Sequence, residues 1–167
     1  YSRSLIESAV KRNAAFSDGL MVVGNKGNRQ LSEKSLEKLG ISEYMDIVEA
    51  TPRNTAPAIA FAAFAAKPDD ILLVTPADHI IQEGPEYSIA VQKAIELAEQ
   101  GNIVTFGIQP TKPETGYGYI KLGTEYRHSG KHHVHMVSAF TEKPRLAIAK
   151  EYYFSGHYLW NSGMFIW

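Results

Sequence analysis

The sequence of 167 residues contains no cysteine. This absence excludes disulfide bonds, thiolate metal sites and cysteine nucleophiles, and it fits a reducing compartment such as the cytoplasm. Neither sign of charge dominates, because 17 Lys and Arg residues are balanced by 18 Asp and Glu residues. The resulting net charge of −1 gives no indication of a nucleic-acid partner or of binding to an anionic membrane. No apolar run approaches the ~18 residues of a membrane span.

The rest of the composition, 44% hydrophobic and 21% charged, is typical of a globular protein. The length is sufficient for one domain with a hydrophobic core. The chain begins at Tyr1, inside a helix-like pattern, and ends at Trp167, inside a strand-like one. We therefore expect residues 1–167 to be part of a larger domain.

Helix-like and strand-like segments alternate along the first two thirds of the chain, a pattern that favours βαβ units and a parallel sheet. Helices are expected over residues 2–13, 28–39, 86–100 and 146–154. Strands are expected over residues 20–25, 46–50, 71–75 and 103–108. After residue 108 two strand-like segments, 117–122 and 134–141, follow each other without a helix, which predicts a partly antiparallel excursion before a last strand within 159–167.

A further helix is expected to begin at Asn54 or Thr55, either of which can cap it, with Pro57 in its first turn. Its residues are apolar on all sides, including Phe61 and Phe64 among many alanines. We therefore expect this helix to be buried.

The segment Leu72–His79 ends a buried-type strand with Pro76, Asp78 and His79. Ligands in open α/β sheets bind beyond the carboxyl ends of the strands. Mg²⁺ is commonly held by one or two carboxylates together with substrate phosphates and water, so Asp78 is a candidate metal ligand. Taken alone, Asp78 could equally cap the next turn, and His79 is expected to pack or hydrogen-bond rather than to catalyse.

Three other clusters lie on predicted loops or strand ends, where binding residues concentrate. Residues 53–58 open a helix whose free N–H groups suit an anion or a base edge, although a simple cap would have the same pattern. Residues 114–120 place two glycines around Tyr117, which permits close backbone approach to a ligand or a plain hairpin turn. Residues 142–144 and 160–164 contribute Glu and Asn, which can bind vicinal hydroxyls, and Lys, which can neutralise a phosphate, although each segment alone could be an ordinary loop.

Three histidines, His132, His133 and His135, fall in one strand-like segment. Alternate residues of a strand share a face, so His133 and His135 could pair while His132 points away. No carboxylate or cysteine lies close by in sequence, and we therefore expect a solvated polar stretch rather than a metal site.

Five motifs in this order resemble those of the nucleotide-sugar pyrophosphorylases, in particular the mannose-1-phosphate guanylyltransferase subfamily. They are Arg53–Ala58, Pro76–His79, Pro113–Ile120, Phe140–Pro144 and Trp160–Phe165. Five matches in register indicate the subfamily and override the local alternatives given above. The resemblance implies an α/β fold, Rossmann-like, with the three α/β/α layers of nucleotide-diphospho-sugar transferases and a mixed, mostly parallel sheet. Residues 1–167 would be a partial catalytic domain.

The resemblance also implies a reaction, in which GTP and α-D-mannose 1-phosphate give GDP-mannose and pyrophosphate without a covalent enzyme intermediate. Catalysis would consist of positioning and of charge neutralisation by Mg²⁺ and cationic side chains. The implied catalytic residues are Asp78, as the Mg²⁺ ligand, and Lys143, on the sugar phosphate. The implied nucleotide-binding residues are Arg53, Asn54, Thr55, Ala56, Pro57, Pro76 and Ala77. The implied sugar-binding residues are Gly116, Tyr117, Gly118, Glu142 and Asn161.

One departure concerns the family's Gly-rich loop, which carries an Arg and a Lys and would precede the first helix. The other departure concerns a second Mg²⁺-binding Asp, which would follow Trp167. Neither the loop nor this Asp is in this sequence. We therefore expect this polypeptide by itself not to catalyse the transfer.

Two alternatives stay open: a non-catalytic relative that binds GDP-mannose and regulates a partner, and a pyrophosphorylase for another sugar or base. The implied setting is cytoplasmic synthesis of polysaccharide precursors. The sequence leaves open both homo-oligomer formation and an additional C-terminal mannose-6-phosphate isomerase domain.

Overall fold

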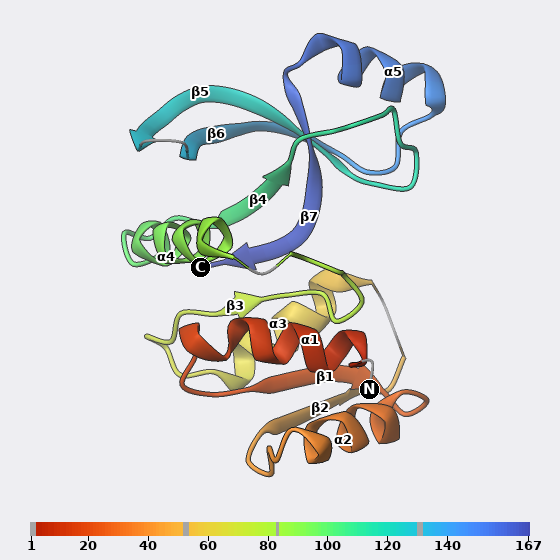
Figure 1. Ribbon diagram of the computed structural model, residues 1–167, viewed down its shortest axis with the longest axis vertical. Helices are drawn as coiled ribbons and strands as arrows, with labels where there is room; N and C mark the ends of the chain where they lie inside the picture. Colours follow the sequence, from red (N-terminus) through yellow and green to blue (C-terminus); the bar gives the residue numbers. More distant parts are fainter. Residues whose placement is uncertain (1–2, 52–53, 83, 130–131) are drawn as a thin grey trace. The chain divides into compact units, whose positions relative to one another are not determined.

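The computed structural model describes residues 3–51, 54–82, 84–129 and 132–167. The chain divides into two compact units (Figure 1). The first unit comprises the chain up to Ile103 together with Ile166 and Trp167, and the second comprises Val104–Phe165.

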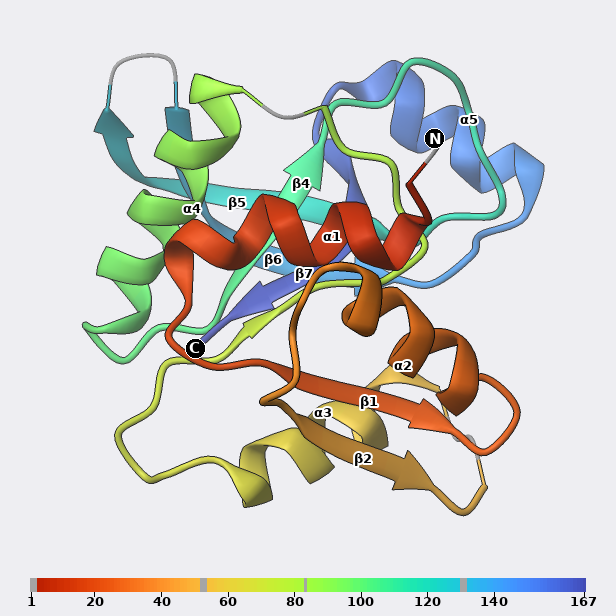
Figure 2. The ribbon, with the colours of Figure 1, turned by 60° about the horizontal axis from the view of Figure 1, so that its bottom comes forward.

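The first unit is built around a parallel pair of strands. Its elements are α1 (Leu5–Asn13), the short 3₁₀ helix η1 (Ala14–Phe16), β1 (Met21–Asn25), α2 (Arg29–Lys38), β2 (Met45–Glu49), α3 (Thr55–Ala65), β3 (Leu73–Val74) and α4 (Pro85–Ala98). Strands β1 and β2 are parallel, with Met21 opposite Met45 and Asn25 opposite Glu49. Helix α2 lies on one face of this pair and α3 on the other (Figure 2). Beside β3, the Leu72 N–H donates to the carbonyl of Trp167 over 2.9 Å.

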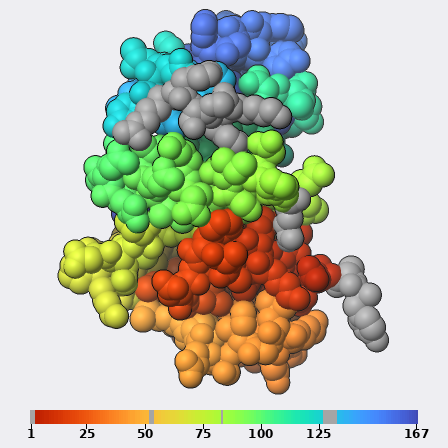
Figure 3. Space-filling view, turned by 60° about the vertical axis from the view of Figure 1, so that its left-hand side comes forward, coloured from red at the N-terminus to blue at the C-terminus, as the bar shows by residue number. Residues whose placement is uncertain are grey.

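Helix α1 begins with a capping box. The Ser4 hydroxyl accepts from the Glu7 N–H, and the Glu7 carboxylate accepts from the Ser4 N–H, both over 3.3 Å. The helix packs against α2 (Figure 3), where the Ser4 and Ser35 hydroxyls are 3.2 Å apart. Leu36 of α2 is fully buried. The capping box therefore starts α1, and the packing of α1 against α2 holds the helix in place.

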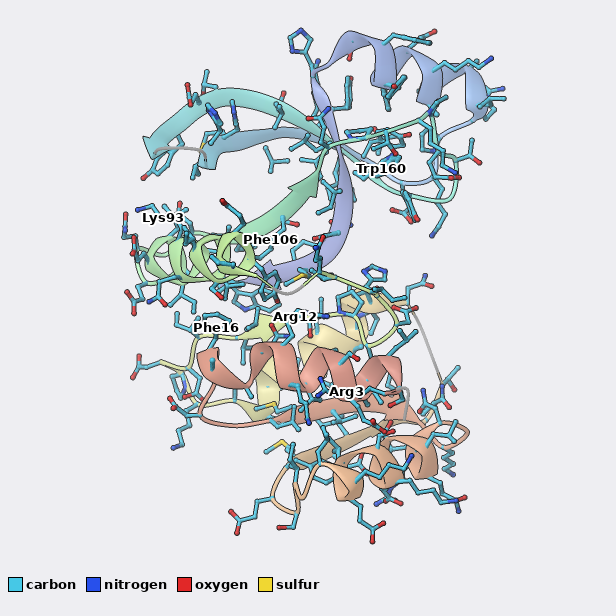
Figure 4. The ribbon with its side chains drawn as sticks, in the orientation of Figure 1. Arg3, Arg12, Phe16, Lys93, Phe106 and Trp160 are labelled. Atoms are coloured by element: carbon cyan, nitrogen blue, oxygen red, sulfur yellow. The ribbon has the colours of Figure 1, made fainter. Side chains whose placement is uncertain are left out.

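Helix α4 buries one face, as its spacing of apolar residues predicts. The buried residues are Val91, Ala94, Leu97 and Ala98. Tyr87 of α4 contacts Phe16 edge-on, with ring centroids 6.4 Å apart, and lies 5.6 Å from the Arg12 guanidinium. Figure 4 shows Arg12 and Phe16 at the end of α1 from which these contacts are made. Burial raises the pKa of the Tyr87 hydroxyl above its ordinary value.

The second unit is a strand-rich body with one helix. Its elements are β4 (Val104–Ile108), β5 (Tyr119–Ser129), β6 (His132–Thr141), α5 (Leu146–Ser155) and β7 (Tyr158–Ile166). Strand β5 pairs antiparallel with both β6 and β7, so that Tyr119 lies opposite Thr141 on one side and Trp160 on the other. Strand β4 pairs with β7. The fully buried Tyr119 contacts Tyr152 of α5 at 5.4 Å between ring centroids, and these contacts hold α5 to the strands.

The predicted order of helices and strands is confirmed, including the antiparallel excursion after residue 108. The mixed α/β fold class is confirmed as well. Among the described residues, no helix is long and apolar enough to cross a membrane.

The expectation that the helix after Asn54 is buried is wrong. Ala62 is the one buried residue of α3, whereas Phe61 is 51% and Phe64 88% exposed. The reason is geometric, because β1 and β2 cover only one side of α3 within the described residues. An apolar sequence pattern does not show how many sides of a helix will be covered by other elements. The strand expected over residues 71–75 is also shorter, Leu73–Val74, and both of its residues are only half-buried.

Candidate functional site

Two non-glycine residues in the described part of the chain have a positive φ angle, Asn54 at 65° and Lys143 at 41°. Both belong to the predicted site residues. Such backbone conformations cost about 1–3 kcal/mol each and concentrate at ligand-binding and catalytic positions. Asn54, with ψ at −168°, lies in a region that is almost restricted to glycine. The strain therefore falls on two of the motifs that the sequence singled out.

The predicted nucleotide-binding segment opens α3. Asn54 is the N-cap residue, but its side chain makes no capping hydrogen bond. Thr55 and Ala56 are exposed, and Pro57 occupies the first turn. The first N–H groups of an α-helix have no partner within the helix, so this end can meet an acceptor atom of a ligand. Arg53 lies outside the described residues.

Asp78 lies in the turn that follows β3, after Pro76 and Ala77. Its side chain is 81% exposed, and its Oδ1 is 3.7 Å from Nε2 of His79. Asp78 belongs to no group of three metal-binding side chains among the described residues. A carboxylate oxygen is a suitable Mg²⁺ ligand, and substrate phosphates and water commonly complete such a shell. Asp78 thus fits a Mg²⁺ site of the kind that is completed by substrate.

In the second unit, Gly118, Glu142 and Asn161 come together. Gly118 immediately precedes β5, Glu142 follows β6, and Asn161 lies in β7. The Asn161 N–H donates to the Gly118 carbonyl over 2.8 Å. A Cβ atom on Gly118 would lie 2.6 Å from Oε2 of Glu142 and 3.5 Å from Cβ of Asn161. Pairing of three strands therefore assembles these predicted sugar-binding residues, and the lack of a side chain at Gly118 leaves the space that the carboxylate occupies.

The polar atoms of this cluster are oriented by neighbouring groups. Lys143 Nζ donates to Oε1 of Glu142 over 2.6 Å, and the two side chains are 62% and 57% exposed. Oδ1 of Asn161 accepts from the Gly163 N–H over 3.0 Å and lies 3.4 Å from the Thr105 hydroxyl. This fixes the amide and leaves its Nδ2 donor without a partner within the described residues. A carboxylate acceptor and an amide donor placed close together can bind neighbouring hydroxyls of a sugar.

Thr105 is a residue that the sequence analysis missed. It lies on β4 and reaches both Oδ1 of Asn161 and, over 3.0 Å, the carbonyl of Met164. Its only signal in the sequence is a hydroxyl within an otherwise apolar strand.

The loop before β5, with predicted residues Gly116 and Tyr117, is held by a buried tyrosine. The Tyr119 hydroxyl donates to the Glu114 carbonyl over 2.7 Å and accepts from the Glu114 N–H over 2.9 Å. The hydrogen bond from Lys112, followed by those from the Gly116 and Thr115 N–H groups, holds the pKa of the Glu114 carboxyl below its ordinary value. These contacts order the backbone that reaches Gly118.

Tyr117 contacts Trp160 edge-on, with ring centroids 5.1 Å apart at 70°. Trp160 is labelled in Figure 4. Trp160 is the neighbour of Asn161 on β7, and its Nε1 is buried without a hydrogen-bond partner among the described residues. Tyr117 itself is 48% exposed. The aromatic pair thus joins the loop before β5 to β7 next to Asn161.

Comparison with known proteins agrees with these motifs. All of residues 1–167 match the family described as Nucleotidyl transferase. The xanthan biosynthesis protein XanB of Xanthomonas campestris is 46% identical over 149 residues, which cover 87% of this chain and 31% of XanB. The mannose-1-phosphate guanylyltransferase RfbM of Salmonella typhimurium is 41% identical over 169 residues, which cover 98% of this chain and 34% of RfbM. The chain thus spans about a third of the length of these curated relatives.

A solved structure extends the agreement to the fold. The crystal structure of a mannose-6-phosphate isomerase from Helicobacter pylori superposes with a TM-score of 0.86 and 36% sequence identity, covering 99% of this chain and 61% of that one. Likeness over the whole length, both in sequence and in three dimensions, confirms the predicted resemblance. The chain therefore belongs to the nucleotidyl transferase family.

Proposed function

We propose that the protein containing this chain transfers a guanylyl group from GTP to α-D-mannose 1-phosphate, forming GDP-mannose and pyrophosphate. The observation that carries the proposal is the convergence of Gly118, Glu142 and Asn161 beside the cation of Lys143. Hydroxyl-binding groups next to a phosphate-binding charge match a sugar phosphate. The names of RfbM and XanB support mannose 1-phosphate as substrate and a role in polysaccharide synthesis.

In the proposed reaction, a phosphate oxygen of mannose 1-phosphate attacks the α-phosphorus of GTP. The new P–O bond forms as the bond between the α-phosphorus and the oxygen that bridges to the β-phosphorus breaks, and pyrophosphate leaves in line. Glu142 would accept from sugar hydroxyls and Asn161 Nδ2 would donate to one. Lys143 would exchange its contact with Glu142 for the sugar phosphate, which lowers the repulsion between the two phosphorylated substrates.

The first unit would bind the nucleotide. Asn54, Thr55, Ala56 and Pro57, with Arg53, would line the pocket for the guanine base at the start of α3, and Pro76 and Ala77 would border the pocket. Asp78 would hold Mg²⁺, which when bound supplies positive charge to the phosphate oxygens. The 81% exposure of the Asp78 side chain supports this role, because the carboxylate is accessible to a metal–nucleotide complex.

The proposal is tested by measuring pyrophosphate release from the complete protein with different substrate pairs. GTP with mannose 1-phosphate should be used with a higher kcat/KM than ATP or dTTP, and than GTP with glucose 1-phosphate. Preference for dTTP or for another sugar would overturn the proposal. Tight binding of GDP-mannose without any turnover would also overturn it and would favour the regulatory alternative.

Asp78→Asn in the complete protein tests the metal role. Losing the anionic ligand should lower kcat about 100-fold or more, because charge stabilisation of this kind is worth that much in catalysis. The free energy of unfolding should change by no more than about 0.5 kcal/mol, since the side chain is exposed. The matched control is Asp69→Asn, an exposed carboxylate beyond α3, which should leave both quantities unchanged. Parallel losses of activity and stability would instead indicate a structural Asp78.

A further inference from the structure

Strands β5 and β6 bring Glu125, His133 and His135 together at a distance from the motifs discussed so far. Each residue offers one potential ligand atom, and these atoms lie within 4.8 Å of one another. Glu125 is directly opposite His135 in the strand register. His133 lies two residues before His135 and therefore on the same face. Nδ1 of His133 is 3.0 Å from Oε1 of Glu125, and the two imidazole rings are stacked with centroids 6.3 Å apart.

An irregular strand register creates this arrangement. The pairing of β5 with β6 shifts on both sides of Glu125, between Leu122 and Glu125 and again between Glu125 and Arg127. At Gly123 a Cβ atom would lie 2.8 Å from the Met136 carbonyl oxygen, so the backbones approach closely there. Bulges of this kind redirect side chains and are frequent near functional sites. They supply the carboxylate that sequence proximity alone did not offer to the histidines.

His135 is also oriented as a metal ligand would be. Its Nδ1 lies 3.4 Å from the Gly123 carbonyl oxygen. In the tautomer that donates this N–H, Nε2 keeps its lone pair for a metal, which is the usual arrangement behind metal-bound histidine. His135 is half-buried, whereas Glu125 and His133 are exposed. The cluster therefore has a fixed side, formed by the strands, and an open side accessible to water.

We propose that the β5–β6 hairpin binds one divalent transition-metal ion of the Zn²⁺ class through Glu125, His133 and His135, with water in the remaining position. Two imidazoles and one carboxylate are a known ligand set for Zn²⁺, whereas Mg²⁺ prefers oxygen ligands and near-octahedral geometry. The ligand chemistry thus separates this site from Asp78.

The site is also remote from the proposed sugar-binding cluster. Tyr119, next to Gly118, and Glu125 lie six residues apart on β5, which corresponds to about 20 Å along a strand. The ion would join the two strands far from the substrates. The inference stands on the hairpin alone and does not depend on the proposed function.

The test is calorimetric titration of the metal-stripped complete protein with Zn²⁺ in the presence of excess Mg²⁺. We expect saturable binding of one Zn²⁺ per chain. Loss of a residue that merely hydrogen-bonds to a metal ligand weakens metal binding about 10- to 100-fold. Loss of a ligand itself, in Glu125→Gln, His133→Gln or His135→Gln, should therefore weaken Zn²⁺ binding at least tenfold. His157→Gln, which changes an exposed histidine outside the cluster, is the control and should bind Zn²⁺ like the unsubstituted protein. Circular dichroism without metal checks that each variant is folded.

Co²⁺ gives a second readout that does not depend on affinity. Its visible absorption spectrum should report a low-coordinate site with nitrogen ligands, and His133→Gln/His135→Gln should abolish that spectrum. Absence of saturable Zn²⁺ binding by the unsubstituted protein would overturn the proposal. Unchanged Zn²⁺ affinity in the double variant would overturn it as well, as would loss of Zn²⁺ binding in Asp78→Asn alone.

Discussion

Lys143 combines a charge that we propose to be functional with an unfavourable backbone conformation. Lys143, between Glu142 and Pro144, has a φ angle of 41°. Its ammonium group contacts the Glu142 carboxylate. A left-handed conformation costs a non-glycine residue about 1–2 kcal/mol. The side chain is 62% exposed and contributes little packing, so the position does not serve stability.

Replacing Lys143 by Ala should therefore raise KM for mannose 1-phosphate about tenfold or more, since a charge-assisted hydrogen bond is worth about 1.5–3 kcal/mol. KM for GTP should change much less. Initial-rate kinetics with each substrate varied will measure both, and Lys150→Ala on α5 is the exposed control. Lys143→Gly should lose the same affinity while raising the free energy of unfolding, because glycine relieves the strain. A change confined to KM for GTP would contradict the assignment.

Gly118 leaves the space in which the Glu142 carboxylate lies. Gly118→Ala would place a methyl group 2.6 Å from Oε2 of Glu142, at the end of a side chain that can move away. The variant should fold, but the displaced carboxylate should weaken mannose 1-phosphate binding more than GTP binding. Calorimetric titration of each substrate measures this difference. Gly19→Ala, where no atom lies within 4 Å of the new methyl group, is the control. Unaltered sugar-phosphate affinity would exclude a role for this close packing.

At the scale of elements, one hydroxyl orders the loop that precedes β5. Tyr119 is fully buried, and its hydroxyl bonds both the N–H and the carbonyl of Glu114. Tyr119→Phe should lower the free energy of unfolding by about 1–3 kcal/mol, the cost of leaving partly buried polar groups without partners. Urea unfolding will measure this cost. Tyr153→Phe, on α5, removes a hydroxyl that makes no hydrogen bond within the described residues and is the control. Equal effects of the two substitutions would contradict the ordering role of Tyr119.

The elements themselves show what local pattern can predict. The capping box at Ser4, the glycine that follows α2 and the apolar spacing of α4 each determine an element from a few neighbouring residues. The predicted ends of α2 and α4 lie within two residues of the observed ones, whereas the first helix, expected from residue 2, begins at Leu5 after its capping box. The strand before Asp78 has no comparable signal of its length, because a strand extends only as far as its pairing partner.

At the scale of the whole molecule, a residue belongs to the core because the fold buries it, and not because its side chain is hydrophobic. Leu36 of α2 is completely buried, whereas Phe64 of α3 is 88% exposed. Leu36→Ala should cost about 2–5 kcal/mol of unfolding free energy, as for other large-to-small core changes. Phe64→Ala removes more atoms but should cost no more than about 0.5 kcal/mol in this chain. Denaturant unfolding of the two variants compares them directly, and a larger loss for Phe64→Ala would show that α3 is covered in solution.

The sequence by itself determined the order of helices and strands and the positions of the five motifs. Caps, turn residues and apolar periodicity act over a few residues, so they can be recognised without knowing the fold. The family followed from the motifs, and comparison with known proteins confirmed it. The roles of Asp78 and Lys143 within that family stay predictions.

Only the tertiary structure decided which distant side chains meet. Strand pairing joins Gly118 to Glu142 and Asn161, and it joins Glu125 to His133 and His135 across a bulged register. It also left Phe64 exposed on a helix whose composition predicts burial. The physical reason is common to all three: strand register and helix coverage depend on contacts between residues far apart in the chain, which no local pattern encodes.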